Sequence, residues 1–226
     1  MKIAILGTGT VGQTFAEKFI ALGHQVMMGT RNVSDTMNRT KGSLPFGDWH
    51  SKNKSVLLGT FAEAAAYGEI IVNAMQGAVT IAAINTCNKS DFDHKIIIDI
   101  ANPLDFSKGF PPSLIEGLNN TNSLGEELQK TLPNAKVVKT LNTMNCLIMV
   151  NPAMVNDGNH INYICGNDAD AKEKVKIILN SFGWKNENLL DLGDISNARG
   201  TEGTLLIWTR VYAATQNGAF NFSIVK

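Results

Sequence analysis

Apolar residues in this chain gather in short runs, which stretches of helix length separate. Most runs are apolar at consecutive positions, which is typical of strands that are buried on both faces. The runs that predict strands lie at residues 2–6, 25–29, 56–58, 70–74, 95–100 and 136–140. Because helices alternate with these strands, we predict an α/β fold with a doubly wound parallel sheet, covered by helices on both sides.

Helix signals fill the intervals between the runs. Apolar residues recur at near-helical spacing from Val11 to Leu22, Gly23 then ends that helix, and a further helical stretch follows Ala78. Residues 60–63 and 123–126 each match a capping box, in which a hydroxyl and a carboxylate satisfy free backbone N–H groups at a helix start. The polar residues 31–54 predict a long excursion over the surface.

The pattern changes after about residue 150. Residues 161–165 and 189–192 predict strands, and residues 168–182 predict an amphipathic helix that ends at Gly183. Residues 204–214 are mostly apolar all round, which predicts a buried or interface helix. We therefore predict two parts: residues 1–150 as the main α/β domain, and residues 151–226 as a small C-terminal α/β lobe packed on it.

Composition excludes several classes of protein. The 226 residues carry no net charge, which gives no long-range attraction to nucleic acid or to anionic membranes. No apolar run is long enough to span a membrane, and the chain opens into a strand without a basic leader, so we expect a cytoplasmic protein. The three cysteines are far apart, which argues against a disulfide scaffold and against a zinc site. We predict no metal site.

A glycine-rich turn links the first predicted strand to the first predicted helix. Its glycines fit the pattern GxGxxG: Gly7 allows a tight turn, Gly9 lets a pyrophosphate approach the backbone, and Gly12 lets helix and strand pack closely. The start of the helix adds free N–H groups and a partial positive charge. This turn predicts a dinucleotide-binding domain of the Rossmann type. The residues predicted to touch the cofactor here are Gly7, Thr8, Gly9, Thr10, Val11 and Gly12.

The end of the second predicted strand indicates which dinucleotide binds. NAD sites usually have an acidic residue there, which bonds the ribose 2′-hydroxyl. This chain has Thr30, Arg31 and Asn32 instead. A guanidinium can clamp a 2′-phosphate through two hydrogen bonds, and a hydroxyl can add a third, so NADP(H) is the predicted cofactor. The alternative is that Arg31 only lies in solvent.

Loops after three other predicted strands complete the site, because open α/β sheets bind ligands at the carboxyl ends of their strands. The residues predicted to lie near the nicotinamide are Ala74, Met75, Gln76, Ala101, Asn102, Pro103 and Asn142. The amides of Asn102 and Asn142 could bond the nicotinamide ribose or carboxamide, or could merely cap turns.

Residues for acid–base chemistry on an alcohol are missing from the sequence. No tyrosine has a lysine four residues further on, and GxSxG, HExxH and the P-loop are absent. The four histidines fall mostly at turns, where we expect solvent-exposed roles. We therefore predict no catalytic side chain, and favour a hydride exchange between two cofactors that the protein aligns.

Six segments together resemble a known family, the NADP oxidoreductases that depend on coenzyme F-420. The resemblance covers nearly the whole chain and rests on residues 7–12 with 30–31, 99–104, 122–126, 139–143 and 197–202. It implies a second ligand, a deazaflavin such as coenzyme F-420, stacked over the nicotinamide between the two parts of the chain. It also implies NADP phosphate contacts at Thr8, Thr30 and Arg31, and a second site shaped by Arg199, Gly200 and Gly203.

Two other functions stay open at this point. A related domain in membrane ferric reductases passes electrons from NADPH to a flavin, so the second ligand could be a flavin and the activity that of a flavin or ferric reductase. A non-catalytic NADP(H)-sensing protein is the alternative of another class. Residues 31–54 and the apolar helix at 204–214 could then serve a partner protein, or a homodimer.

Overall fold

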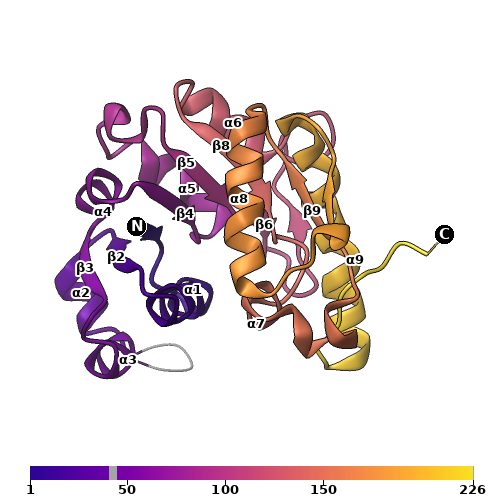
Figure 1. Cartoon of the computed structure of the whole chain (residues 1–226), viewed down its shortest axis with the longest axis horizontal. Helices are drawn as coiled ribbons and strands as arrows, with labels where there is room; N and C mark the ends of the chain where they lie inside the picture. The colour runs from indigo at the N-terminus through magenta and orange to yellow at the C-terminus, as the bar shows by residue number, and fades with distance from the viewer. Residues whose placement is uncertain (41–44, 226) are drawn as a thin grey trace.

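The computed structural model describes residues 1–40 and 45–225. Its centre is an eight-stranded sheet with the order β10-β9-β8-β5-β4-β1-β2-β3 (Figure 1). The strands are β1 (Lys2–Leu6), β2 (Gln25–Thr30), β3 (Leu57–Thr60), β4 (Ile70–Asn73), β5 (Ile96–Asp99), β8 (Lys136–Thr140), β9 (Asn162–Cys165) and β10 (Leu189–Asp191). The predicted α/β fold is confirmed, because each predicted strand is present within two residues of its expected ends.

The sheet has a parallel part and an antiparallel junction. From β3 to β8 every neighbouring pair is parallel, whereas β9 runs antiparallel to β8 and β10 runs parallel to β9. Residues after 150 thus extend the same sheet rather than forming one of their own. The division of the chain at residue 150 stays a prediction.

Helices cover both faces of the sheet because successive strand residues point in opposite directions. Ile3 and Ile5 belong to one apolar cluster with α1, α7 and α8, and Ala4 and Leu6 belong to the other with α4, α5 and α6. The helices are α1 (Thr10–Ala21), α2 (Val33–Met37), α3 (Phe46–Lys52), α4 (Phe61–Tyr67), α5 (Gly77–Ile84), α6 (Leu124–Thr131), α7 (Cys146–Val150), α8 (Ala169–Phe182) and α9 (Ala198–Thr215). Short 3₁₀ helices lie at Lys89–Phe92, Pro152–Met154, Asn156–Gly158, Asn186–Asn188 and Ile195–Asn197, and the two-residue strands β6 (Leu104–Asp105) and β7 (Ser113–Leu114) form a small hairpin.

The described part of residues 31–54 lies mostly at the surface, as predicted, but it contains two short helices that the prediction did not include; residues 41–44 lie outside the described residues. Two short helices, α2 and α3, fold back against α1 and β3. Phe46 and Trp49 are buried in the core, and the Trp49 indole donates a hydrogen bond of 2.6 Å to Glu17 on α1. Two aromatic residues in a short helix give too few turns for a helical period to show in the sequence.

The two predicted capping boxes differ. At α4 the Thr60 hydroxyl accepts from the Glu63 N–H while the Glu63 carboxylate accepts from the Thr60 N–H, so the box is complete. At α6 the Ser123 hydroxyl accepts from the Glu126 N–H, but the Glu126 carboxylate turns to Arg199 instead of the Ser123 backbone. That ion pair joins α6 to α9.

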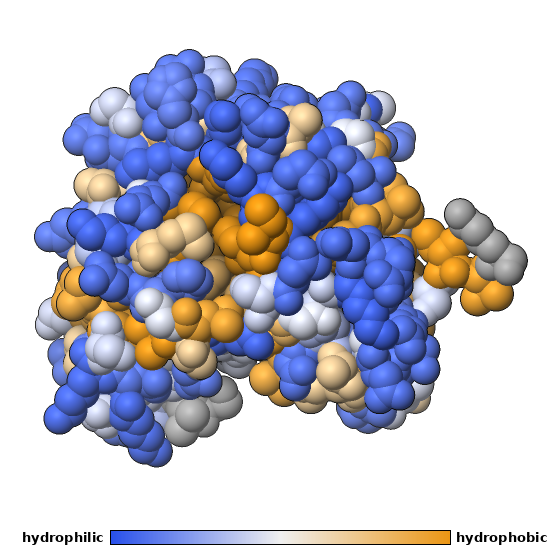
Figure 2. All heavy atoms as spheres, viewed as in Figure 1, coloured by the Kyte–Doolittle hydropathy of each residue, from blue (hydrophilic) through white to orange (hydrophobic). Residues whose placement is uncertain are grey.

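Helix α9 begins six residues earlier than predicted and is covered on one side only. Ala198, Glu202 and Leu205 lie on its buried face, whereas Ile207 is exposed. Beyond α9 the C-terminal tail extends from the body and carries the exposed apolar Val225 (Figures 1 and 2). Within residues 1–40 and 45–225, no helix combines the length and the apolar character that a membrane crossing needs.

Candidate functional site

The carboxyl ends of β1 and β4 lie side by side at the point where the chain changes direction across the sheet, the position at which open α/β sheets bind ligands. Gly7 follows β1 with φ at +119°, and a Cβ there would lie 2.6 Å from the Ala74 carbonyl oxygen. Only glycine tolerates both the dihedral angle and this close approach. The glycine-rich turn and the loop after β4 therefore meet, as the sequence predicts.

The other two glycines of the turn, Gly9 and Gly12, have different structural roles. A Cβ at Gly12 would overlap the Gly7 carbonyl oxygen, so Gly12 lets α1 start close to β1. At Gly9 a Cβ would meet no atom within 4 Å, and no side chain caps the start of α1 there. Open space beside uncapped helix N–H groups is what a pyrophosphate needs. Thr8, Thr10 and Val11 lie on the same turn.

A cavity of about 560 Å³ opens at the end of β2. Thr30 and Arg31 line it together with Thr60, Phe61 and Val79. The Thr30 hydroxyl is buried and bonds the Thr36 hydroxyl at 2.6 Å, whereas Arg31 is exposed at this cavity and is the cation there that could meet a phosphate. Asn32 does not line this cavity; its side chain caps α2 by accepting from the Asp35 N–H.

Arg39 is a cation of this region that the sequence did not indicate. Its guanidinium donates to the Thr8 carbonyl oxygen at 2.6 Å and to the Thr8 hydroxyl at 3.3 Å, and it lies 5.7 Å from the centre of the Phe46 ring. A second positive charge therefore rests on the glycine-rich turn. No motif or spacing could have marked Arg39, because the fold of residues 31–54 brings it there.

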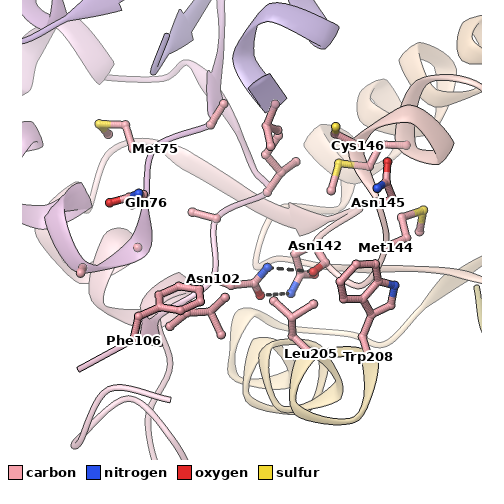
Figure 3. Close-up of a pocket in the computed structure, with 18 residues that line it drawn as sticks. Met75, Gln76, Asn102, Phe106, Asn142, Met144, Asn145, Cys146, Leu205 and Trp208 are labelled. Atoms are coloured by element: carbon pink, nitrogen blue, oxygen red, sulfur yellow. Dashed lines mark hydrogen bonds between the residues drawn. The ribbon is translucent and has the colours of Figure 1, made fainter. Parts of the chain in front are cut away.

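A second cavity, of about 360 Å³, lies on the other side of the turn (Figure 3). It collects the loops after β4, β5 and β8 and one face of α9. Among its lining residues are seven that the sequence predicts: Val11, Ala74, Met75, Gln76, Ala101, Asn102 and Asn142. Pro103 is buried beside it without lining it, and its carbonyl accepts from the Ile115 N–H. The wall that the sequence missed includes Phe106, Met144, Met149, Leu205 and Trp208.

The two predicted amides bond each other at this cavity. The Asn102 Nδ2 donates to the Asn142 carbonyl oxygen at 2.8 Å, and the Asn142 Nδ2 donates to the Asn102 Oδ1 at 2.9 Å (Figure 3). Asn142 is buried, and its Oδ1 finds no partner within the part of the chain that the structure describes. A buried acceptor without a partner costs about 1–3 kcal/mol, so a ligand N–H that reached it would bind favourably.

Beneath the cavity lies a buried ionic network. The Lys139 ammonium, on β8, is 2.9 Å from the Asp99 carboxylate at the end of β5 and 2.7 Å from the Glu202 carboxylate on α9. Its third donor bonds the Ala101 carbonyl oxygen at 2.6 Å. Burial alone would lower the pKa of Lys139, but the two carboxylates outweigh it and raise that pKa. Burial also raises the pKa of Glu202, against the pull of Lys139.

This network holds the loops that form the cavity. Asp99 Oδ1 accepts from Asn73 and from the Ala101 N–H, and Asn73 in turn accepts from the Met75 N–H. Glu202 accepts from the N–H groups of Leu124 and Gly125, which start α6. The loops after β4 and β5, helix α6 and helix α9 are therefore joined through buried charges.

Two comparisons bear on what this arrangement is. The family model described as NADP oxidoreductase coenzyme F-420-dependent matches residues 2–103. A crystal structure from Arthrobacter sp. FB24, provisionally named an F-420-dependent NADP reductase, is 47% identical over the full length of both chains, with a TM-score of 0.95. The chain belongs to this F-420-dependent NADP oxidoreductase family. It is thus an NADP-dependent oxidoreductase by family, as the motifs predicted.

Two more distant similarities were found for this oxidoreductase. Metalloreductase STEAP3 of Rattus norvegicus is 27% identical over 202 residues; the match covers 89% of this chain but 36% of the STEAP3 chain. A reductive aminase from Aspergillus terreus, in complex with NADPH and ethyl levulinate, is 14% identical with a TM-score of 0.61, covering 95% of this chain and 62% of the aminase. At that identity the aminase shows a shared fold alone.

Two expectations about side chains of the oxidoreductase need correction. Arg199, Gly200 and Gly203 do not line the cavity; Arg199 pairs with Glu126, and α9 reaches the cavity with Leu205 and Trp208, further along the helix. His160 is not exposed but buried. Its ring nitrogens bond the Pro152 carbonyl oxygen at 2.9 Å and the Asn221 amide at 2.8 Å, which is a structural role. The described residues hold no cluster of side chains able to bind a metal ion.

Proposed function

We propose that this chain transfers a hydride between NADP(H) and a second flat ring, of which a deazaflavin of the coenzyme F-420 type is the leading candidate. The observation that carries the proposal is the cavity beside the glycine-rich turn. It adjoins the loops where a nicotinamide is expected, and α9 closes its other side with Leu205 and Trp208. Family membership supports the same choice of second ring.

The residues fit NADP(H) at three places. The open space at Gly9 and the uncapped start of α1 suit the pyrophosphate. Arg31 suits the 2′-phosphate, and Arg39 adds charge at the turn. The unpartnered Oδ1 of Asn142 suits the N–H group of a carboxamide. NADPH, when bound, supplies the hydride.

The role left to the protein is alignment and exclusion of water. The cavity lining among the described residues has no carboxylate, imidazole or amine that could take a proton from an alcohol. A hydride exchange between two rings needs no such group, because the reacting rings carry the chemistry. Its rate depends on holding them in the reactive geometry, and the buried Lys139 network gives the cavity loops the necessary rigidity.

A flavin or ferric reductase is the second candidate. The similarity to STEAP3 favours it, although this chain matches only about a third of that protein's length. The third candidate is an NADP(H) sensor without turnover, acting through a partner protein.

Separate anaerobic incubations distinguish these functions. NADPH is mixed with the protein and a deazaflavin, FMN, FAD, or a ferric chelate with and without flavin. Oxidation of NADPH by the deazaflavin at the highest kcat/KM supports the leading proposal. A higher kcat/KM with a flavin, or reduction of the chelate, favours the second candidate. If NADPH binds but is not oxidised with any of these acceptors, the result favours the third candidate, the NADP(H) sensor.

A further inference from the structure

The cavity at the ring end of the site has no charged wall among the described residues. Its apolar surface comes from side chains such as Met75, Phe106, Met144, Leu205 and Trp208. Its polar surface consists mainly of side-chain amides, those of Gln76, Asn102, Asn142 and Asn145. In Figure 3 the amides of Asn102 and Asn142 lie between the phenyl ring of Phe106 and the indole of Trp208, with no charged side chain drawn among them.

The dinucleotide end of the same site is built differently. Arg31 lines the cavity at β2, and Arg39 lies on the glycine-rich turn. Guanidinium groups are the usual means of binding phosphate oxygens. The fold therefore supplies cations where an anion is expected, and residues 1–40 and 45–225 supply none to the lining at the ring end.

The nearest buried cation cannot compensate. All three donors of Lys139 are taken, by Asp99, Glu202 and the Ala101 carbonyl oxygen. Two carboxylates surround this single ammonium, so the network beneath the cavity gives an approaching anion no attraction.

The outer edge of the cavity is apolar too. Phe106 both lines the cavity and is 57% exposed. Lys108, two residues further on, is exposed and does not line it. A charged tail attached to a bound ring would thus leave the cavity past an aromatic side chain rather than past a basic one.

We infer that the second site takes a neutral flat heteroaromatic ring through its faces and its amide-like edge, and does not read an anionic tail on that ring. The inference rests on the proposed function, whose second ring it specifies. Alternating N–H and C=O groups on the edge of a flavin or deazaflavin match the side-chain amides of Gln76, Asn102 and Asn145, because an amide both donates and accepts. A phosphate or carboxylate on the tail adds nothing to affinity.

Riboflavin and FMN test this directly, since they share a ring and differ by one phosphate. Each is titrated into the protein saturated with NADP⁺, at low and at high salt, and binding is read from quenching of flavin fluorescence. Dissociation constants within about threefold of each other at both salt concentrations are expected. An FMN preference of tenfold or more that fades with salt would overturn the inference, as would binding of neither flavin.

Two matched variants locate the effect. Phe106→Arg places a guanidinium at the cavity edge, and is expected to create a preference for FMN of about fivefold or more at low salt. Phe110→Arg, on an equally exposed phenylalanine that does not line the cavity, is expected to leave the ratio near one. If Phe106→Arg also left it near one, the flavin would bind elsewhere and the inference would be wrong.

Turnover separates this inference from the proposed function. Equal binding of both flavins without NADPH oxidation by any ring would contradict the proposed hydride transfer but support the binding inference. Turnover with a strong preference for phosphorylated rings would support hydride transfer but contradict the binding inference.

Discussion

Replacing Lys139 by methionine removes the only ammonium of the buried network while keeping most of the side-chain length. Asp99 and Glu202 then remain buried without their shared cation. Asp99 keeps two hydrogen-bond donors, from Asn73 and Ala101, and Glu202 keeps two from the backbone of α6, but neither keeps an opposite charge. The Ala101 carbonyl oxygen also loses its partner.

Removing one partner of a buried ion pair costs about 3–5 kcal/mol, because the charge left behind is uncompensated. In domains of this size each kcal/mol shifts the melting temperature by about 2–4 °C. Lys139→Met should therefore lower the free energy of unfolding by about 3–5 kcal/mol and the melting temperature by about 6–20 °C. Adding Glu202→Gln removes one of the two stranded charges, so the double variant should be more stable than Lys139→Met alone.

The sign of the pH dependence follows from Glu202. Burial already raises the pKa of Glu202 and Lys139 opposes that rise, so without Lys139 the pKa of Glu202 in the folded protein rises further above its unfolded value, and the folded state holds a proton that the unfolded state releases. Stability is then retained at acidic pH and lost as pH rises through the raised pKa of Glu202. The deficit of Lys139→Met against the native protein should be smaller at about pH 5 than at about pH 8.

The assay is denaturant unfolding followed by tryptophan fluorescence, with Lys136→Met as the control. Lys136 lies on the same strand and pairs with Asp168 at 2.9 Å, but both side chains are about one-third exposed. An exposed pair of this kind contributes about 0–1 kcal/mol. If Lys139→Met destabilised the protein no more than Lys136→Met, the network would not be what holds the cavity loops.

Three further predictions concern the dinucleotide. Arg31→Ala should raise the Kd for NADPH at least tenfold, about 1.4 kcal/mol, and leave that for NADH nearly unchanged; equal losses in titrations would refute the 2′-phosphate role. Arg39→Ala should weaken NADPH and NADH by a similar factor of about ten, because Arg39 contacts the turn through Thr8; unchanged affinities would place it outside the site. Gly9→Val should keep its melting temperature, since a Cβ meets no atom within 4 Å, yet lose NADPH binding; normal binding by calorimetry would mean that no pyrophosphate lies there.

The sheet and the turn could be predicted because their signals are local. Consecutive apolar residues such as Ile96–Ile98 indicate a strand that is buried on both faces. The pattern GxGxxG between a strand and a helix indicates where the backbone must come close to neighbouring backbone or to a ligand. The loops at Ala74 and Ala101 followed from one topological rule, that parallel strands end at one edge of the sheet.

Contacts between distant segments could not be predicted. Lys139 meets Asp99 and Glu202 across 40 and 63 residues, and nothing in the spacing of three charges marks them as partners. His160 gave the same difficulty, because a polar side chain at a turn is usually exposed and only the fold brings Asn221 to it. The sequence did not predict that Leu205 lines the cavity, because which face of α9 points toward the cavity depends on the residue at which the helix starts.

Two variants on α9 can test both where the hydride acceptor binds and whether the hydride passes directly from NADPH to it. Leu205→Trp would fill the cavity, whereas Ile207→Trp adds the same side chain on the exposed face of the same helix. The reaction uses NADPH with both nicotinamide C4 hydrogens replaced by deuterium, and the uncharged deazaflavin core as acceptor. Mass spectrometry of the reduced ring reports where its new hydrogen came from. Deuterium on the ring carbon of the product, in the native protein and in Ile207→Trp but not in Leu205→Trp, is the predicted result. A reduced ring that carries hydrogen from the solvent, or no reduction of the deazaflavin by the native protein, would contradict direct hydride transfer in this cavity.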